Sequence, residues 1–237
     1  MTSPAPQLSV IIPAYNESQV IAQTLAAACE ALNGLDFELI VVDDGSQDET
    51  PTRVRQAAQT DPRIVLMRYD LNRGKGHAIQ HGFARARGER VAFLDADLDL
   101  HPRLLCNLMQ VMDQTQADLV IGSKLHPQSR VYYPLWRRVL SQGYYLIIRL
   151  LFGLPVQDTQ TGIKLFRRAV LAQVLPRLTI EGFAFDLQLL VLAHRYGYRI
   201  ASAPVVLTWG HSRLGRIGWR VVWQIWWDTL LVFLRTR

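Results

Sequence analysis

The stretch VAFLDADLDL, residues 91–100, joins a short apolar run to three carboxylates at alternate positions, Asp95, Asp97 and Asp99. An apolar run of this length is typical of a buried strand when turn residues bound it. Carboxylates this close together repel one another unless a cation lies among them. Their oxygens are the ligands that Mg²⁺ and Mn²⁺ prefer, so the stretch predicts a strand that ends at a divalent-metal site. A solvated turn with helix-capping acids is the alternative.

The same alternation of apolar runs and helix-like segments continues on both sides of this stretch. Strands are expected at 8–12, 37–42, 64–68, 91–94 and 119–122, and helices at 17–32, 48–59, 76–86 and 103–114. Beyond them we expect helices at 134–152 and 184–196, a strand at 199–207 and a last apolar helix at 217–234. Ser46 and Glu49 are expected to form a capping box. The pattern predicts an α/β fold of βαβ units around a mainly parallel sheet flanked by helices.

Polar residues follow three of the predicted strands at their carboxyl ends. Asn16 and Glu17 follow the first strand, Asp43 and Asp44 end the second, and the carboxylate cluster follows the fourth. Ligands of open α/β sheets bind beyond the carboxyl ends of the strands. We therefore expect these groups to converge on one crevice, in which one carboxylate of VVDDGSQDET caps backbone donors and the other bonds a ribose hydroxyl or a base N–H.

The loop NRGKGHA, residues 72–78, carries Lys75 between two glycines. It lacks the GxxxxGK[ST] spacing of a P-loop. Its functional interpretation is a loop that brings one cation towards a phosphate, and simple surface exposure is the alternative.

Charge is distributed unevenly along the 237 residues, whose net charge is +6. Residues 1–118 carry 10 Lys and Arg against 16 Asp and Glu, a balance of −6, whereas residues 119–237 carry 16 against 4, a balance of +12. The basic residues of the second half are interleaved with aliphatic and Trp-rich runs, which favours an anionic membrane surface over nucleic acid. The N-terminus lacks the features of a signal peptide, so we expect a protein that faces the cytoplasm.

The stretches VIIPAYNE, VVDDGSQDET, NRGKGHAI and FLDADLD, in this order and spacing, resemble the family 2 glycosyltransferases with the GT-A fold. GSK, RRVLSQG, DTQTGIKLF, EGFAFDLQLL and GHSRLG resemble the polyprenyl-phosphate branch of that family, and two of them are closest to dolichyl-phosphate β-glucosyltransferases. The resemblance implies a GT-A domain over 1–216, with a nucleotide-sugar and metal half at 1–122 and an acceptor half at 123–216. An amphipathic membrane-surface helix over 217–237 would follow it.

The resemblance and the residue pattern together assign roles by position. The residues expected to bind the nucleotide sugar are Pro13, Ala14, Tyr15, Glu17, Val42, Asp44, Lys75, Asp95, Ala96, Asp97, Lys124 and Arg213. The expected metal ligands are Asp95, Asp97 and Asp99, the catalytic residues Asp97 and Asp186, and the lipid-phosphate residues Arg137 and Ser141. Asp186 is expected to act as a base, to orient the donor sugar, or to pair with an arginine. The stretch VVLTW lacks an arginine that mannose synthases carry, which weakens a mannose assignment.

The activity implied by the resemblance is that of an inverting transferase with Mg²⁺ or Mn²⁺ as cofactor. It would move a hexose from a nucleoside-diphosphate sugar to a polyprenyl or dolichyl phosphate at the cytoplasmic membrane face. Glucose is favoured over mannose as the hexose, and UDP-glucose over GDP-mannose as the donor. Three alternatives stay open: mannosyl transfer to the same lipid class, a family 2 enzyme with a soluble or glycan acceptor, and a non-catalytic membrane-surface module.

The helix expected at 217–234 has its polar residues, Arg220, Gln224 and Asp228, on one narrow stripe opposite several tryptophans. Charged side chains near a bilayer centre cost about 2.5–3.5 kcal/mol each, which argues against a spanning helix. An amphipathic helix of this kind lies in the plane of the membrane surface. The alternative is that the tryptophans pack on the domain or form an oligomer contact.

Overall fold

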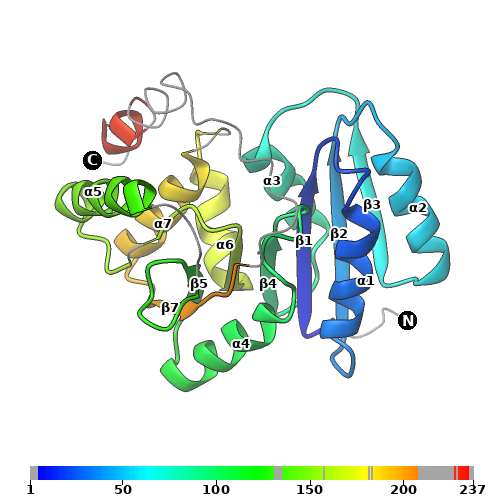
Figure 1. The fold of residues 1–237 in the computed structure, drawn as a ribbon, viewed down its shortest axis with the longest axis horizontal. Helices are drawn as coiled ribbons and strands as arrows, with labels where there is room; N and C mark the ends of the chain where they lie inside the picture. The colour runs from blue at the N-terminus through cyan, green and yellow to red at the C-terminus, as the bar shows by residue number, and fades with distance from the viewer. Residues whose placement is uncertain are drawn as a thin grey trace.

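The computed structural model describes residues 5–130, 135–156, 158–180, 182, 184–207, 227 and 229–234, although the side chains of 135–142 and 144 lie outside that description. Figure 1 shows the fold. The elements follow in the order β1 (Leu8–Ala14), α1 (Ile21–Ala31), β2 (Phe37–Asp44), α2 (Thr50–Thr60), β3 (Ile64–Tyr69), α3 (Lys75–Arg85), β4 (Arg90–Leu94), α4 (Leu104–Thr115), β5 (Leu119–Ser123), α5 (Leu135–Phe152), β6 (Ile163–Arg167), α6 (Arg168–Val174), η1 (Leu175–Arg177), α7 (Phe185–Arg195) and β7 (Ile200–Pro204).

Seven strands form one sheet in the order β3-β2-β1-β4-β6-β5-β7. β1 runs parallel to β2 and β4, β2 to β3, and β5 to β7. β6 lies between β4 and β5 and is antiparallel to both. The prediction of an α/β fold with a mainly parallel sheet is therefore confirmed, and the inserted antiparallel strand is an addition to it. This insertion brings residues that follow α5 in the chain alongside the end of β4.

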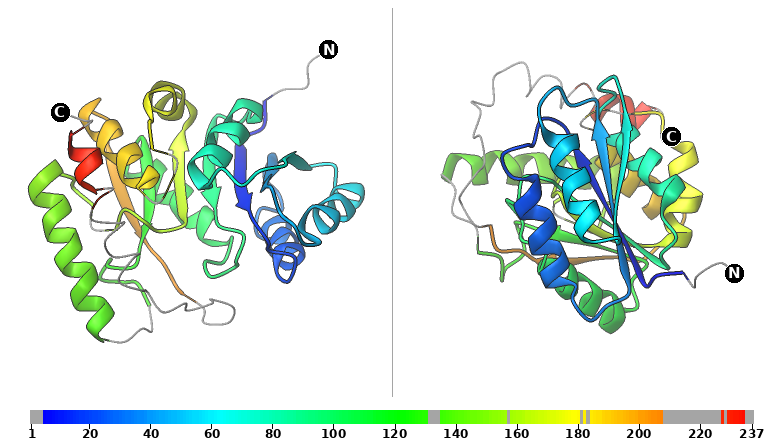
Figure 2. Two further views of the ribbon diagram at one scale, coloured as in Figure 1. Left: turned by 90° about the horizontal axis from the view of Figure 1, so that it is seen from above. Right: turned by 90° about the vertical axis from the view of Figure 1, so that its right-hand side faces the viewer.

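The central strands have a core on each side, because successive side chains of a strand point to opposite faces. In β1, Val10 and Ile12 face the core that α1, α2 and α4 cover, whereas Ile11 faces the core that α3, α5, α6 and α7 cover. All three side chains are fully buried. Figure 2 shows helices on both faces of the sheet. Burial on both faces explains why these strands appear in the sequence as continuous apolar runs.

The start of α2 differs from the prediction. Ser46 and Glu49 form no capping box, since the Ser46 Oγ accepts a hydrogen bond from the Asn16 N–H at 2.9 Å and Glu49 pairs with Arg53 at 3.0 Å. The side chain of Glu49, the N-cap residue of α2, makes no capping hydrogen bond. A local capping pattern in the sequence is thus used for a contact between two loops that are distant in the chain.

The described part of the C-terminal segment is helical and lies beside α5 in Figures 1 and 2. Val232 is fully buried in the core, and the Phe233 ring meets the Phe152 ring edge-on at 5.9 Å between centroids. Trp227, in contrast, is 61% exposed. The segment therefore contacts the domain through Val232 and Phe233, whereas Trp219, Trp223 and Trp226 of the helix expected at 217–234 lie outside the described residues. Among the described helices, none has the length and apolar character to cross a membrane.

Candidate active site

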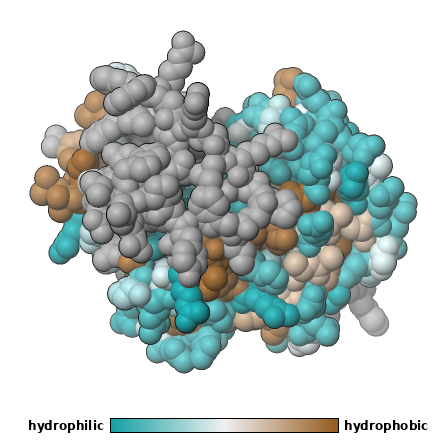
Figure 3. Space-filling model, viewed as in Figure 1, coloured by the Kyte–Doolittle hydropathy of each residue, from teal (hydrophilic) through white to brown (hydrophobic). Residues whose placement is uncertain are grey.

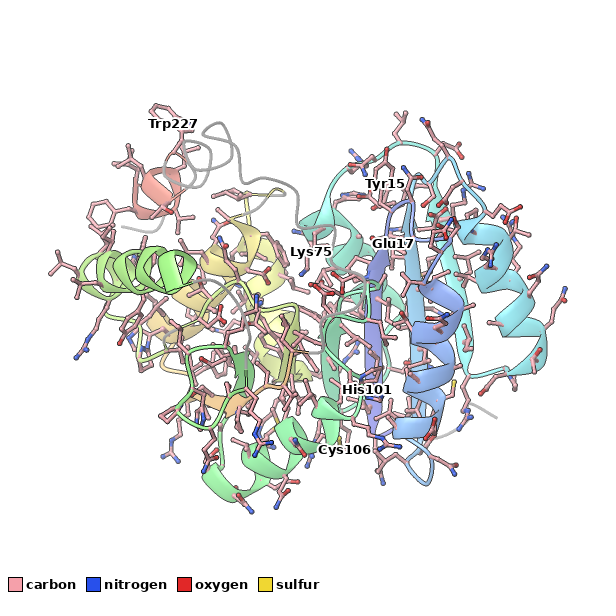
Figure 4. The ribbon with its side chains drawn as sticks, viewed as in Figure 1. Tyr15, Glu17, Lys75, His101, Cys106 and Trp227 are labelled. Carbon is pink, nitrogen blue, oxygen red and sulfur yellow. The ribbon has the colours of Figure 1, made fainter. Side chains whose placement is uncertain are left out.

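A cavity of about 280 Å³ opens at the carboxyl ends of β1, β2 and β4. Figure 4 shows Tyr15, Glu17 and Lys75 in the upper half of the view, whereas His101 and Cys106 lie below them. The cavity is lined by Pro13, Ala14, Tyr15, Glu17, Asp44, Asn72, Gly74, Lys75, Asp95, Ala96 and Asp97. All of these except Asn72 and Gly74 are residues that the sequence predicted for the nucleotide-sugar site. The expected convergence of the three strand ends is confirmed.

Asp44 anchors the loop that carries Lys75. Its two carboxylate oxygens accept hydrogen bonds from the backbone N–H groups of Arg73 at 2.7 Å and Gly74 at 2.9 Å. Gly74 directly precedes α3 and has a φ of 91°, in the left-handed region where a glycine avoids steric cost. Asp44 is only 4% exposed. The carboxylate therefore holds the loop in place, and it also forms part of the cavity lining.

Asp43, the neighbouring acid, does not line the cavity. It is fully buried, lies 3.1 Å from the Arg68 Nε and accepts a hydrogen bond from the Ser46 N–H at 3.3 Å. Asp43 is therefore the acid that stabilises the turn after β2, and Asp44 is the one that faces the cavity.

Hydrogen bonds join the loop after β1, which lines the cavity, to the start of α2. Asp48 is the centre of this junction because it accepts hydrogen bonds from the Ser18 N–H at 3.1 Å and the Thr50 N–H at 2.9 Å. Burial alone would raise the pKa of Asp48, but the bonds from Thr50 and Ser18 outweigh it and lower this pKa to about 2. The Glu17 N–H in turn donates to the Thr50 Oγ1 at 2.8 Å.

Asp95 and Asp97 face the cavity from the turn after β4. The Asp95 N–H donates to the Gly162 carbonyl at 3.2 Å, and the buried Thr24 hydroxyl donates to the Ala96 carbonyl at 2.7 Å. Burial raises the pKa of Asp97, and the nearby Asp95 carboxylate also acts in that direction. A cation between the two carboxylates would relieve this repulsion.

Asp99 does not join this pair in the cavity. Leu98 has a φ of 60°, which turns the chain, and the Asp99 N–H donates to the Asp97 Oδ1 at 3.1 Å. Within the described part of the chain, no three His, Cys, Asp or Glu side chains are grouped so that they could hold a metal ion. The expected three-carboxylate cluster is therefore not formed. The two remaining carboxylates, Asp95 and Asp97, offer oxygen ligands of the kind that Mg²⁺ and Mn²⁺ prefer and would hold such an ion at the cavity.

Lys75 lies between two carboxylates. Its Nζ is 2.7 Å from the Asp95 Oδ1 and 3.7 Å from the Asp186 Oδ2. Burial would lower the pKa of Lys75, but Asp95 and Asp186 outweigh it and raise this pKa. Lys75 is therefore a cation at the wall of the cavity, beside the pair of acids.

Asp186, in the first turn of α7, lies behind Lys75 rather than in the cavity lining. It is 6% exposed, and its Oδ1 is 2.8 Å from the Nζ of Lys164. Burial would raise the pKa of Asp186, but Lys164 and Lys75 outweigh it and hold this pKa below the usual value, so the group is a carboxylate. The ion pair expected with an arginine is formed with lysines instead.

The other predicted residues have different positions. Val42 is fully buried in the core, so its side chain does not line the cavity. Lys124 follows β5, outside the lining, and its N–H donates to the Asp158 Oδ2 at 3.0 Å. Arg137 and Ser141 lie on α5 with side chains outside the described part, and Arg213 lies outside the described residues altogether.

Two residues of the stretch DTQTGIKLF, Gly162 and Lys164, support the site although the sequence did not single them out. A Cβ atom at Gly162 would lie 1.7 Å from the Asp95 Oδ2, so only a glycine leaves room for this carboxylate. The signal that could have identified Lys164 is a lone charge within an otherwise apolar run.

Comparison with known proteins places this site in a family. The model of the family described as Glycosyl transferase family 2 matches residues 9–175. The chain is 32% identical over 208 residues to Glycosyltransferase AglD of Haloferax volcanii, a match that covers 86% of this chain and 33% of that protein. It is 34% identical over 209 residues to Dolichyl-phosphate beta-glucosyltransferase ALG5A of Trichomonas vaginalis, covering 84% of this chain and 64% of that protein. The chain thus spans between one third and slightly less than two thirds of the length of these relatives.

A solved structure gives the same fold. Glucosyl-3-phosphoglycerate synthase from Mycobacterium tuberculosis, in complex with Mn²⁺, uridine diphosphate and glucosyl-3-phosphoglycerate, superposes with a TM-score of 0.70 at 21% identity. The superposition covers 98% of this chain and 78% of that one, and it confirms the predicted GT-A fold. With the family match over most of its length, the chain belongs to glycosyltransferase family 2.

Proposed function

We propose that this chain is an inverting hexosyltransferase that moves glucose from UDP-glucose to a polyprenyl or dolichyl phosphate at the cytoplasmic face of a membrane. One observation carries the proposal: a single cavity at the strand ends brings together paired carboxylates, a lysine and two hydrogen-bonded loops. A non-catalytic surface module has no use for such a constellation. The acceptor class rests on the relative from Trichomonas vaginalis, whose name gives dolichyl phosphate as its acceptor.

The nucleotide would occupy the wall formed by the loops after β1 and β2. Tyr15, which is 42% exposed, offers a ring against a base, and Pro13 and Ala14 continue the wall. A carboxylate has about four acceptor sites, so Asp44 can bond a ribose hydroxyl while it holds two backbone N–H groups. Because the hydrogen bonds of Asp48 hold this wall in place beforehand, little ordering remains for binding.

The diphosphate would lie between the carboxylate pair and Lys75. A divalent cation held by Asp95 and Asp97 supplies Lewis-acid stabilisation of the leaving diphosphate when it is bound. The Lys75 ammonium adds a fixed positive charge beside the same oxygens. The proposal holds for Mg²⁺ and for Mn²⁺, and Asp99 contributes by holding Asp97 through its backbone N–H.

The acceptor phosphate is already ionised near pH 7, so its oxygen can attack the anomeric carbon without a strong general base. Attack opposite the leaving diphosphate inverts the configuration at that carbon. Asp186 does not line the cavity and is paired with two lysines, which suits a role in the charge of the site rather than proton transfer. Arg137, Ser141 and Arg213 remain our proposed contacts for the anionic groups of lipid and donor, and Lys124 would support the donor diphosphate from the end of β5.

Exposed apolar side chains at one end of the molecule support attachment to a membrane surface. On α5, Leu146 is 64% and Leu150 84% exposed; Trp227, Leu230 and Leu234 add 61%, 46% and 59% from the adjacent C-terminal helix. Hydrophobic surface is visible at this end of the molecule, at the left edge of Figure 3. Arg149 and the basic excess of residues 119–237 add attraction to anionic lipid, roughly 1 kcal/mol for each basic residue near the surface. In this arrangement residues 1–122 bind the donor, residues 123–216 the acceptor, and 217–237 the membrane surface.

A donor and acceptor screen tests the proposal. Purified protein is incubated with UDP-glucose or GDP-mannose, with a polyprenyl phosphate or a panel of soluble sugars, and with Mg²⁺, Mn²⁺ or EDTA. We expect a glucosylated lipid phosphate in the presence of either metal and none in EDTA. Faster turnover of GDP-mannose would overturn the donor, transfer only to soluble sugars would overturn the acceptor, and full activity in EDTA would overturn the metal site.

A further inference from the structure

The side chain of Lys164 is almost completely buried. Lys164 is the second residue of β6 and is 1% exposed. Its Nζ donates to the Thr161 carbonyl at 2.6 Å and is 2.8 Å from the Asp186 Oδ1. Apolar residues of similar volume often replace a buried ion pair without loss of stability, and sometimes with a gain. Stability therefore gives little reason for a lysine here, and a function for it has to be sought.

Lys164 is the buried end of a row of four alternating charges. From the core outward the row runs Lys164, Asp186, Lys75 and Asp95, with separations of 2.8, 3.7 and 2.7 Å between the charged atoms. Asp95 and Lys75 line the cavity, whereas Lys164 and Asp186 do not. A change at the buried end can therefore reach the cavity through these side chains alone.

The two carboxylate oxygens of Asp186 face different lysines. The Oδ1 faces Lys164, and the Oδ2 faces Lys75 at a distance 1.0 Å longer than the separation of Lys75 and Asp95. If Lys164 loses its charge, Asp186 is left buried with Lys75 as its remaining partner in this row. The attraction then draws the Lys75 ammonium away from Asp95 and towards Asp186, which removes it from the cavity wall.

The start of β6 holds both ends of this row. The Thr161 carbonyl accepts from Lys164, and the neighbouring Gly162 carbonyl accepts from the Asp95 N–H at 3.2 Å. One short backbone segment thus fixes the buried lysine and the cavity carboxylate relative to each other.

We infer that Lys164 is a positioning residue for hexosyl transfer: by holding Asp186 it keeps Lys75 on Asp95 at the cavity wall. The inference rests on the proposed function, and it adds a residue that contacts neither the cavity nor a substrate. Burial lowers the pKa of Lys164 while Asp186 opposes this, so the two groups depend on each other for their charges.

The first arm of the test reads the position of Lys75 without any turnover. The chain has three lysines, Lys75, Lys124 and Lys164, so ¹⁵N-lysine labelling gives three side-chain signals. In Lys164→Met we expect the Lys75 ammonium signal to shift while the Lys124 signal, the internal control, stays in place. A Lys75 signal that does not move would overturn the inference.

The second arm is a double-mutant cycle on transfer. Lys164→Met should lower kcat by about 100-fold, the scale of a misplacement of about 1 Å, with the KM for the donor changed by less than about threefold. Asp186→Asn should also lower kcat, and Lys164→Met/Asp186→Asn should be no slower than Asp186→Asn alone, because Lys164 acts through Asp186. Losses that multiply, or an unchanged kcat in Lys164→Met, would overturn the inference.

The double variant also keeps the test decisive if Lys164→Met fails to fold, because it leaves no unpaired buried charge. Its kcat should then match that of Asp186→Asn, and a further loss of about tenfold or more would contradict the inference. If the Lys75 signal shifts in Lys164→Met but the wild type transfers no hexose, the proposed function alone is overturned. If the wild type transfers hexose but the Lys75 signal does not shift in Lys164→Met, the inference alone is overturned.

Discussion

Replacing Gly162 by alanine should disable the site while leaving the sheet folded. The new Cβ would lie 1.7 Å from the Asp95 Oδ2 and 2.3 Å from its Cγ, whereas real Cβ contacts are essentially never shorter than 3.0 Å. The carboxylate oxygen must therefore retreat by at least about 1.3 Å. A misplacement of about 1 Å can cost about 100-fold in rate, which corresponds to about 2.7 kcal/mol of transition-state stabilisation.

The assay for Gly162→Ala is kcat/KM for hexose transfer, together with the thermal midpoint and the affinity for UDP in Mn²⁺. We expect a loss of about 100-fold in kcat/KM with a thermal midpoint close to that of the wild type. Gly143→Ala is the control, because a Cβ there meets no atom within 4 Å and alanine stabilises a helix relative to glycine by about 0.5–1 kcal/mol. Wild-type kcat/KM in a folded Gly162→Ala would refute the reasoning, since Asp95 would then function from a displaced position.

Three further predictions follow from single contacts. The pKa of Asp48 is lowered to about 2 in the folded protein, against about 3.9 in the unfolded chain. Asp48 therefore stabilises the fold fully above about pH 3.9, and this contribution is lost as the pH falls towards about 2. Asp48→Asn should accordingly flatten the acid side of a plot of thermal midpoint against pH. Asp44→Asn replaces an acceptor of two backbone N–H groups, and titration calorimetry should show UDP affinity about tenfold weaker; unchanged affinity would contradict the anchoring role. Leu150→Glu/Leu230→Glu should reduce flotation with anionic liposomes while UDP affinity stays constant, and Leu71→Glu, at another exposed leucine, should float as the wild type does.

The sequence predicted every strand of the sheet except β6, including the partly buried edge strands β3 and β7. β1, β2 and β4 appear as mostly apolar runs because α-helices cover both sides of the sheet. β6 escaped prediction because Lys164 interrupts its apolar run, and the charge of that lysine is paired with Asp186, a partner 22 residues further along the chain. Such a pairing is invisible to periodicity, because it depends on where two distant segments meet.

The residues of the candidate site were likewise predicted only in part. Acids at strand ends located the cavity, since the ends of neighbouring strands meet at one edge of a sheet. The family resemblance added apolar and aromatic lining residues such as Pro13, Tyr15 and Ala96. The residue pattern alone left open which acid of a neighbouring pair faces the cavity, but the family resemblance selected Asp44. Asp44 does face it, whereas Asp43 turns to Arg68. Spacing and the resemblance grouped Asp99 with Asp95 and Asp97, but the chain turns at Leu98 and Asp99 does not line the cavity. Alternation along a strand no longer applies once the chain leaves the sheet.

The most direct test of the account is hexose transfer from UDP-glucose to a polyprenyl phosphate by Asp97→Asn compared with the wild type. Asp97 lies in a turn beyond the end of β4, so the change should leave the thermal midpoint and the circular dichroism spectrum as they are. We predict metal-dependent formation of a glucosylated lipid phosphate by the wild type and none by the variant at equal protein concentration. Equal turnover by the two proteins, or full wild-type turnover in EDTA, would contradict the claim that a metal-binding carboxylate pair drives the transfer.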